Sequence, residues 1–299
     1  MEAIFRIRDK FIPEPLPPLH CFTGHTVVIT GGTTGLGLAA ATHFINLGAH
    51  VIITCRNRTR GESAKTAIEN LIGAPSQGKI EVMELDMDSY RSCCKFVNSL
   101  KDRRMSDGTP KTVECVVLNA GCMNTQYVES PEGWEETIQV NSLSSSLLGL
   151  LLLPWLKTQI SATVPRLVFV TSRDHVDVEI KDWVQWAEEE GILRHLSSKA
   201  AWPSANSVPD SPNYANSKLL LMYAVEEISK LALGNNQEPK VIVTSVCPGL
   251  VHTDIARNFT NQSWLMKILV QTFFAMFSKS ADYGARFYVS AARASKEQH

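Results

Sequence analysis

The chain has 299 residues, of which 44% are hydrophobic and 20% are charged, and this composition can bury the core of one large α/β domain. A net charge of −1 argues against a nucleic-acid-binding protein, in which a basic stripe is expected. The 7 cysteines contain no C-x-x-C pair, so they favour reduced thiols in a cytoplasmic protein over a disulfide framework, and they support no metal site.

Residues 1–23 are predicted to form an N-terminal arm, because they mix charges with prolines and lack the apolar core of a signal peptide. Two later apolar stretches, 143–156 and 264–277, are each shorter than the roughly 20 residues that span a bilayer. We therefore expect no stable membrane span. The first stretch is predicted to be a buried helix. The second is predicted to be a core or lid helix or, alternatively, a helix at a membrane surface.

The stretch VVITGGTTGLG, residues 27–37, starts as a β-branched strand and breaks into a glycine-rich turn. Gly31, Gly35 and Gly37 permit a tight turn, a close approach of the backbone to phosphate, and close packing of the helix that follows. That helix offers free N–H groups and a positive dipole end to a pyrophosphate. An ordinary surface turn is the alternative, because glycines in this order also occur by chance.

Strand-like and helix-like segments alternate along the rest of the chain. The predicted strands span 27–30, 51–54, 80–85, 113–118, 167–171 and 241–246. The predicted helices span 36–47, 59–72, 89–104, 132–158 and 214–233, with a late helix at 281–293. This order predicts one α/β domain over 24–299, built as a doubly wound parallel sheet with helices on both faces.

In such sheets ligands bind beyond the carboxyl ends of the strands. The residues at these ends are Gly31, Arg56, Asp86, Asn119, Ser172, Pro248 and Gly249. Each could be an ordinary turn residue, since these residue types are common in turns. Tyr214 and Lys218 favour a chemical role for the strand ends, because a spacing of four residues puts a phenol and an ammonium on one face of a helix.

Several motifs together resemble the short-chain dehydrogenase/reductase family over about residues 24–255. They are TGGTTGLG at 30–37, NAG at 119–121, Asn141, Ser172, YANSK at 214–218 and PG at 248–249. The start FTGHTVVITGGTTGLG and the long substrate region are similar to retinol-dehydrogenase-like reductases of fungal secondary metabolism. The resemblance implies a Rossmann-type single domain and a nicotinamide cofactor, NAD(P)(H).

The resemblance also implies which residues form the site. The catalytic set is Asn141, Ser172, Tyr214 and Lys218. The cofactor-binding set is Gly31, Thr33, Thr34, Gly35, Leu36, Gly37, Arg56, Asp86, Met87, Asn119, Ala120, Gly121, Tyr214, Lys218, Pro248, Gly249, Val251 and Thr253.

Reduction of a ketone needs a hydride at carbon, which the nicotinamide supplies, and a proton at oxygen. Tyr214 can supply the proton, and we expect the Lys218 ammonium to lower the pKa of the phenol from its usual value near 10. The resemblance implies that Lys218 also bridges the ribose hydroxyls, that Ser172 binds the substrate oxygen and that Asn141 holds a water relay. The structural alternatives are a helix N-cap for Asn141, a turn serine, a half-buried tyrosine and a solvated lysine.

A preference for NADP(H) is predicted from the residues after the second strand. NAD-preferring folds place an acidic residue about 20 positions beyond the glycine turn to hold the ribose 2′-hydroxyl. Residues 24–61 contain no Asp or Glu, and the strand ends instead at Arg56. A guanidinium suits the 2′-phosphate because it stays charged and can donate two parallel hydrogen bonds. Arg58 and Arg60 are predicted only to solvate the start of a helix.

Residues 173–213 form a long insertion relative to the family pattern, and residues 250–280 are predicted to be a lid or substrate helix region. The insertion is predicted either to select the substrate or to be a surface subdomain without that role. Its Trp183, Trp186 and Trp202 combine apolar surface with polar handles. By family standards the chain also ends before a final edge strand, either because it is trimmed or because it has a loose natural tail.

These patterns predict an NADPH-dependent carbonyl reductase or alcohol dehydrogenase that acts on a lipophilic or polyketide-like small molecule in secondary metabolism. The alternative is a non-redox protein of the same fold, which would isomerise, dehydrate or cyclise a substrate or bind cofactor for regulation. The complete Ser, Tyr, Lys and Asn set favours redox chemistry. We also expect a homodimer through the helices at 141–156 and 214–233, because leucines crowd more than one face of the first; burial within one chain is the alternative.

Overall fold

A parallel β-sheet forms the centre of the molecule. The structure, a computed structural model, describes residues 13–76, 78–202, 211–251 and 278–299. Within them the sheet has six strands in the order β3-β2-β1-β4-β5-β6. They are β1 (Thr26–Ile29), β2 (His50–Cys55), β3 (Ile80–Glu84), β4 (Cys115–Leu118), β5 (Arg166–Val170) and β6 (Ile242–Val246). All neighbouring pairs are parallel, which confirms the predicted doubly wound sheet.

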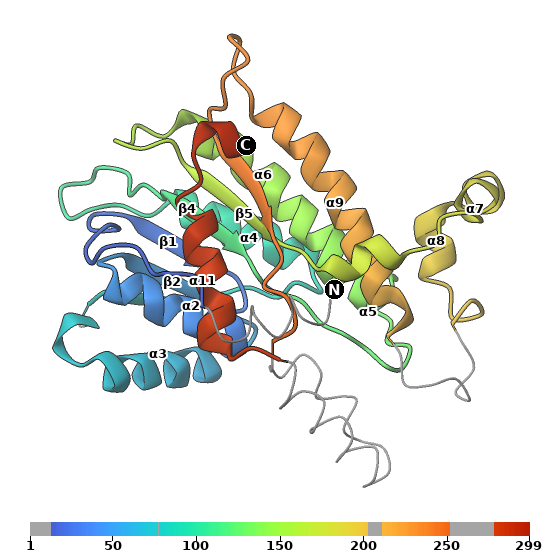
Figure 1. Ribbon diagram of the computed structural model, residues 1–299, viewed down its shortest axis with the longest axis horizontal. Helices are drawn as coiled ribbons and strands as arrows, with labels where there is room; N and C mark the ends of the chain where they lie inside the picture. Colours follow the sequence, from blue (N-terminus) through green and yellow to red (C-terminus); the bar gives the residue numbers. More distant parts are fainter. Residues whose placement is uncertain (1–12, 77, 203–210, 252–277) are drawn as a thin grey trace, which may run out of the picture.

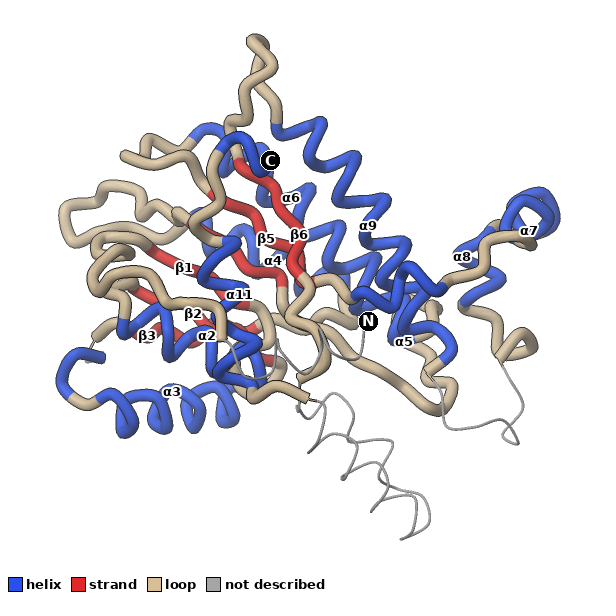
Figure 2. Tube along the Cα trace, in the orientation of Figure 1, coloured by secondary structure: helices blue, strands red, loops and turns tan. Residues whose placement is uncertain are grey.

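Helices cover both faces of this sheet (Figures 1 and 2). One face is covered by α2 (Gly35–Asn46), α3 (Arg58–Ile72) and α11 (Ala281–Ala291). The other is covered by α4 (Tyr90–Lys101), α6 (Ser145–Thr158) and α9 (Pro212–Ala232). Short 3-10 turns span Ala74–Ser76, Arg173–Asp177 and Lys296–Gln298.

Successive side chains of each strand point alternately into two hydrophobic cores, one on each face of the sheet. In β1, Val27 and Ile29 pack with α2 and α11, whereas Val28 packs with the helices of the opposite face. Because successive side chains point to opposite faces, a continuous apolar strand fits a sheet that is covered on both sides. On the second face the approach is close: a Cβ at Gly149 would lie 2.7 Å from Cζ of Phe169. A glycine is therefore required where α6 crosses β5.

The helix predicted over 132–158 begins later and is not uniform. It consists of α5 (Glu136–Ile138), a π-helical segment (Gln139–Ser144) and α6. The combined helix Glu136–Thr158 has the length and composition of a membrane span, but 67% of its apolar window is buried inside the fold. Packing on the sheet explains its composition, as expected for the stretch 143–156. The second apolar stretch, 264–277, lies outside the described residues.

The insertion 173–213 contains α7 (Trp183–Glu189) and α8 (Ile192–Leu196), which lie to the side of the sheet near the start of α9 (Figure 1). Trp183 and Leu196 are buried with Ile138 in a small third core. Trp186 stacks on His195 with ring centroids 4.0 Å apart. The described helices of the insertion thus share a small packed core with α5.

At the N-terminal side, packing begins before the predicted domain start at residue 24. Phe22 is 2% exposed, and its ring meets Phe44 edge-on with centroids 5.0 Å apart. Its N–H also donates to the carbonyl oxygen of Leu47. The end of the predicted arm is therefore part of the first core.

Candidate active site

The glycine-rich turn between β1 and α2 leaves no room for side chains. Gly31 and Gly35 have φ values of +65° and +53°, a region that favours glycine. A Cβ at Gly37 would lie 2.4 Å from the carbonyl oxygen of Gly31 and 2.7 Å from Nδ2 of Asn119. Thr34 is the N-cap of α2, but its side chain makes no capping hydrogen bond. The first N–H groups of α2 are therefore available to an anion such as a pyrophosphate.

Asn119, at the end of β4, holds this turn against the neighbouring strand. Its Nδ2 donates to the carbonyl oxygens of Thr30 at 2.8 Å and of Gly31 at 3.3 Å. In return, the N–H of Ala120 donates to Oγ1 of Thr30 at 2.9 Å. These bonds bring the predicted residues after β1 and β4 together, at the point where the strand order reverses and nucleotides bind in such sheets.

Arg56, predicted to bind a 2′-phosphate, lies at the end of β2 and is already paired with acids. Its Nη1 is 3.2 Å from Oδ2 of Asp88 and 3.9 Å from Oε1 of Glu136. Burial, together with the charges of Glu136 and Asp86, raises the pKa of Asp88 to about 6, against the opposing effect of Arg56. The sequence reasoning missed these carboxylates, because they reach Arg56 from the loop after β3 and from α5. The Arg56 side chain is still 60% exposed, so part of its guanidinium remains accessible.

Asp86 and Met87 follow β3 on the same side of the sheet. The N–H of Asp86 donates to the Ser92 hydroxyl oxygen at 2.9 Å, and Oδ1 of Asp86 accepts a hydrogen bond from the N–H of Asp88 at 3.2 Å. The hydroxyl of Ser144, in the π-helical segment, donates to the carbonyl oxygen of Met87. The loop after β3 is thus fixed between α4 and that segment.

Ser172, Tyr214 and Lys218 come together where β5 ends and α9 begins. The Ser172 side chain lies close enough to Tyr214 to lower the pKa of its phenol, although burial has the larger, opposite effect. Lys218 places Nζ 5.6 Å from the centroid of the Tyr214 ring and donates to the carbonyl oxygen of Val170 at 2.9 Å. Lys218 is 4% exposed, which excludes the solvated-lysine interpretation. The spacing within α9 therefore produces the predicted pairing.

Burial dominates the ionisation of this pair. It raises the pKa of Tyr214, and the charge of Asp174 adds to the effect, whereas the Ser172 side chain opposes it. Burial lowers the pKa of Lys218 from 10.5 to about 8. The prediction that Lys218 lowers the phenol's pKa differs from the structure, because desolvation of a buried phenol outweighs the neighbouring ammonium. At neutral pH the site therefore holds a protonated phenol beside an ammonium.

Asn141 lies inside the π-helical segment, so it is not a helix N-cap. Its Oδ1 accepts the N–H of Cys122 at 2.9 Å, and its Nδ2 donates to the Cys122 carbonyl at 2.9 Å and to Oγ of Ser217 at 3.0 Å. Ser217 lies next to Lys218 in α9. Asn141 therefore joins the loop after β4 to the helix that carries Tyr214 and Lys218. Segments of π-helix are frequently found at functional sites.

The loop after β6 completes this edge of the sheet. Gly249 has a φ of +75°, and Val251 is 7% exposed and forms a parallel bridge with Lys279. The other glycine-turn and loop positions of the predicted set, Thr33, Leu36 and Gly121, lie in the same turns as the residues above. Thr253 and most of the predicted lid region 250–280 lie outside the described residues.

Three further contacts support the site, one of them local and two from distant parts of the chain. His175 places Nδ1 2.5 Å from the carbonyl oxygen of Ser172, which requires that nitrogen to carry the proton. Asn213, next to Tyr214, donates to Oε2 of Glu135 at 3.2 Å. Tyr288 of α11 donates to Asn119. The sequence predicted a late helix at 281–293, which corresponds to α11, but nothing in its pattern singled out Tyr288.

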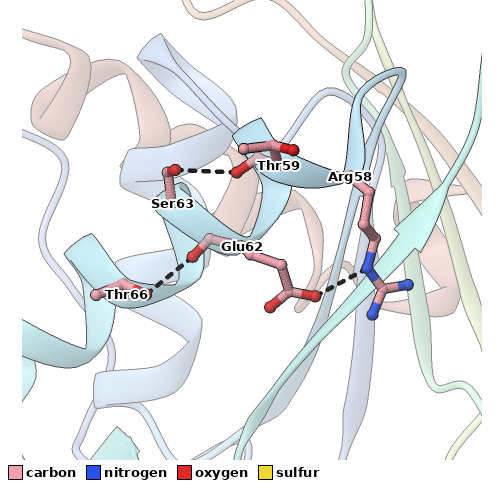
Figure 3. Close-up of a pocket in the computed structure, with 5 residues that line it drawn as sticks. All are labelled: Arg58, Thr59, Glu62, Ser63 and Thr66. Carbon is pink, nitrogen blue, oxygen red and sulfur yellow. Dashed lines mark hydrogen bonds and ion pairs between the residues drawn. The ribbon is translucent and has the colours of Figure 1, made fainter.

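A hollow on the outer face of α3 lies beside the end of β2 (Figure 3). Its polar side chains bond within the helix: Nε of Arg58 donates to Oε1 of Glu62 at 2.8 Å, and Thr66 donates to the Glu62 carbonyl at 3.0 Å. These groups satisfy one another, and Arg58 behaves as the predicted helix-start arginine. We assign the cofactor to the strand ends and not to this hollow.

Comparison with known proteins identifies the family. The family model described as short chain dehydrogenase matches residues 25–179. The chain is 35% identical over 285 residues to the short-chain dehydrogenase/reductase phmF of Phaeosphaeria nodorum, covering 94% of this chain and 78% of that protein. It is 34% identical over 289 residues to the short-chain dehydrogenase/reductase ffsI of Aspergillus flavipes, covering 95% and 78%. The chain therefore belongs to the short-chain dehydrogenase/reductase family, as the sequence motifs predicted.

Solved structures agree on the fold. The Pseudomonas aeruginosa RhlG/NADP active-site complex is similar with a TM-score of 0.66 and 19% identity, covering 95% of this chain and 94% of that one. A short-chain dehydrogenase from Sphingobium yanoikuyae in complex with NADPH has a TM-score of 0.54 and 15% identity, with 86% coverage of both chains. A Burkholderia phymatum relative in complex with NAD has a TM-score of 0.60 and 16% identity, covering 90% and 86%. At these identities the likeness establishes the Rossmann-type fold.

Proposed function

We propose that this oxidoreductase uses NADP(H) to transfer hydride between the nicotinamide and a small lipophilic or polyketide-like ketone or alcohol. The observation that carries the proposal is the buried phenol of Tyr214, with the Ser172 side chain close enough to lower the pKa of that phenol and the Lys218 ammonium 5.6 Å from the ring. A hydroxyl pair of this kind can bind one carbonyl oxygen and protonate it. A protein that only binds a nucleotide does not need these groups together.

The cofactor supplies the hydride when it is bound, and the residues of this chain handle the proton. Tyr214 donates it to the substrate oxygen, and its raised pKa keeps the phenol protonated at neutral pH. Ser172 hydrogen-bonds the same oxygen and orients it. Lys218, which is mostly charged below its pKa of about 8, stabilises the phenolate left after proton transfer. Asn141 holds α9 in register with the loop after β4 through Ser217.

The residues present fit a dinucleotide. Gly37 lets α2 pack closely against the Gly31 carbonyl and the Asn119 amide, and the first N–H groups of α2 have no side-chain cap, so they suit a pyrophosphate. Arg56 supports the choice of NADP(H), because its side chain is 60% exposed and Nη1 alone is directed at Asp88. The remaining donors suit a 2′-phosphate. Solved relatives bind NADP, NADPH or NAD, so this preference rests on Arg56.

The substrate class is supported by the insertion and by the relatives. Trp202 contacts Tyr127 edge-on at 5.8 Å, and Trp183 packs on Ile138, so aromatic and apolar groups lie close to the start of α9. Such surfaces favour a lipophilic substrate. Three fungal relatives, 33% to 35% identical to this chain, carry short-chain dehydrogenase names, which supports a role in fungal secondary metabolism.

A panel of lipophilic ketones and alcohols, with NADPH absorbance followed at equal enzyme concentration and products identified by mass spectrometry, tests the proposal. We expect turnover with at least one ketone and none with Tyr214→Phe, which removes the proton donor and leaves the glycine turn unchanged. Lys218→Ala should damage both turnover and cofactor binding. Normal turnover of a true substrate by Tyr214→Phe would remove the proton-donor role. A product with no change in the nicotinamide would support the non-redox alternative.

A further inference from the structure

The hydroxyl of Tyr288 is bonded to the residue that holds the nucleotide turn. Tyr288 lies in α11, is 0% exposed, and donates to Oδ1 of Asn119 at 2.9 Å from 169 residues away in the sequence. The same amide donates through Nδ2 to the carbonyl oxygens of Thr30 and Gly31. Only one orientation of the Asn119 amide satisfies both sides, because an oxygen can accept from Tyr288 but cannot donate to a carbonyl.

Two further contacts seat α11 on the same turn, where it runs beside α2 (Figure 1). A Cβ at Gly284 would lie 2.6 Å from Cδ2 of Leu36, which is the residue between the last two glycines of the turn. His43 of α2 places Nε2 3.0 Å from the carbonyl oxygen of Asp282. The orientation of Tyr288 towards Asn119 is therefore fixed along the length of α11.

The pKa of Tyr288 keeps its hydroxyl available as a hydrogen-bond donor. Burial raises its pKa well above the usual value, with the nearby charges of Tyr214 and Cys247 adding to the effect. The hydroxyl is therefore protonated at neutral pH and can donate its hydrogen bond there. The Asn119 amide also lies beside Gly37, where an added Cβ would come within 2.7 Å of Nδ2.

We propose that Tyr288 is a positioning residue for the dinucleotide, which acts through Asn119 to hold the carbonyls and N–H groups of the glycine turn in their binding geometry. The proposal rests on the proposed function, since it assumes a nicotinamide dinucleotide at this turn. Because the turn binds the pyrophosphate and not the 2′-phosphate, the loss of the hydroxyl should weaken NADPH and NADH binding by the same factor. Choice between the two cofactors should not change.

The test compares Tyr288→Phe with Tyr223→Phe, a matched control whose ring is 48% exposed in α9. Titration of the full chain with NADPH and with NADH should give dissociation constants about tenfold higher for Tyr288→Phe, the scale of one lost buried hydrogen bond, and unchanged values for the control. In an Asn119→Ala background, Tyr288→Phe should have no further effect, because its action passes through that amide. An unchanged dissociation constant, or an equal further loss in the Asn119→Ala background, overturns the proposal.

Amide hydrogen exchange of the protein without added cofactor separates this proposal from the proposed function. Exchange at Gly31 to Leu36 should be faster in Tyr288→Phe than in the wild type or Tyr223→Phe, while exchange in β1 stays the same. If the wild type binds neither dinucleotide, the proposed function fails, and the exchange result still decides whether Tyr288 fixes the turn. Unchanged exchange at the turn shows that it does not.

Discussion

Asn213 donates from its side-chain amide to the carbonyl oxygen of Leu196 at 2.7 Å, and this bond ties the last residue of α8 to the first turn of α9. The same nitrogen donates to Oε2 of Glu135, a carboxylate that is 0% exposed. Tyr214 is the next residue in the chain. The inserted helices are therefore bonded to the helix that carries the phenol, which favours a role in the site over that of an independent surface subdomain.

Asn213→Ala should reduce both stability and turnover. The substitution removes the Asn213 donor from the Leu196 carbonyl and from Oε2 of Glu135, which keeps the Ile138 N–H, and we expect a loss of about 1–3 kcal/mol in the free energy of unfolding. Because Tyr214 follows directly, kcat should fall more than the cofactor dissociation constant rises. Urea denaturation and steady-state kinetics measure the two effects. Asn98→Ala, at an exposed position of α4, is the control and should change neither. An Asn213→Ala enzyme with wild-type stability would contradict the packing described.

Gly37→Ala should prevent tight dinucleotide binding. Its Cβ would lie 2.4 Å from the Gly31 carbonyl oxygen, so the turn or α2 must shift. Overpacking of this kind typically destabilises by about 1–3 kcal/mol. The matched control is Gly234→Ala, whose nearest neighbour is the flexible end of Lys240 at 2.9 Å and which lies in the loop before β6. Isothermal titration with NADPH checks the outcome; equal affinities for the two variants would contradict the cradle.

Lys218 should lower stability at neutral pH, and the effect should depend on pH. Its pKa falls from 10.5 to about 8 on folding, so the unfolded chain binds more protons between these values. Stability should therefore rise as pH increases through about 8 towards 10.5, and below 8 the full penalty, at most roughly 3 kcal/mol, is present. Lys218→Met lacks the ionisable group. The difference in unfolding free energy between Lys218→Met and wild type should accordingly shrink over that window, and a constant difference would be evidence against a depressed lysine.

Arg56 and Asp88 should act on NADPH in opposite directions. Arg56→Ala should weaken NADPH binding by roughly 1.5 to 3 kcal/mol, the scale of a charged hydrogen bond, and hardly change NADH. Asp88→Asn removes the carboxylate 3.2 Å from Nη1 and should strengthen NADPH binding, again with little effect on NADH. Fluorescence titration of each variant with both cofactors gives the four constants. Equal affinities of the wild type for NADH and NADPH would defeat the assignment.

A dimer is expected through α6 and α9. Leu150 of α6 is 46% exposed and Leu231 of α9 is 57% exposed. The two helices are neighbours, because Lys157 of α6 donates to the Leu231 carbonyl at 3.0 Å. Light scattering at micromolar concentration should give twice the chain mass of 33.1 kDa, and Leu150→Glu should reduce it towards that of one chain. A monomeric wild type would remove this expectation.

The elements with local signals were predicted well. The strands lie within one or two residues of their β-branched runs, and the spacing of Tyr214 and Lys218 produced their neighbouring positions. The helix predicted from 132 begins at Glu136, because residues before it form a bridge between Glu129 and Glu135 instead. Periodicity cannot distinguish that bridge from a first helical turn.

Two contacts that the sequence did not predict join residues that are far apart in the chain. Tyr288 meets Asn119 across 169 residues, and Asp88 meets Arg56 across 32. Nothing in the residues around either partner specifies such a contact, since only the closed fold brings them together. The same holds for the pKa of Tyr214, where burial by the finished structure outweighs the one neighbour that the sequence spacing supplied.

The position of β1 between β2 and β4 has a consequence for how the chain acquires its structure. β1 and β2 can pair as soon as residue 55 has been synthesised. The other edge of β1 pairs with β4, where Val27 lies opposite Cys115, 88 residues later in the chain. The N–H of Thr26 also donates to the side chain of Glu114 across the same separation. Strand pairings over this separation form slowly, because the entropic cost of closing a long loop precedes any stabilising contact. Until then the growing polypeptide presents an unpaired valine-rich edge to its surroundings, which makes early synthesis the stage most exposed to aggregation.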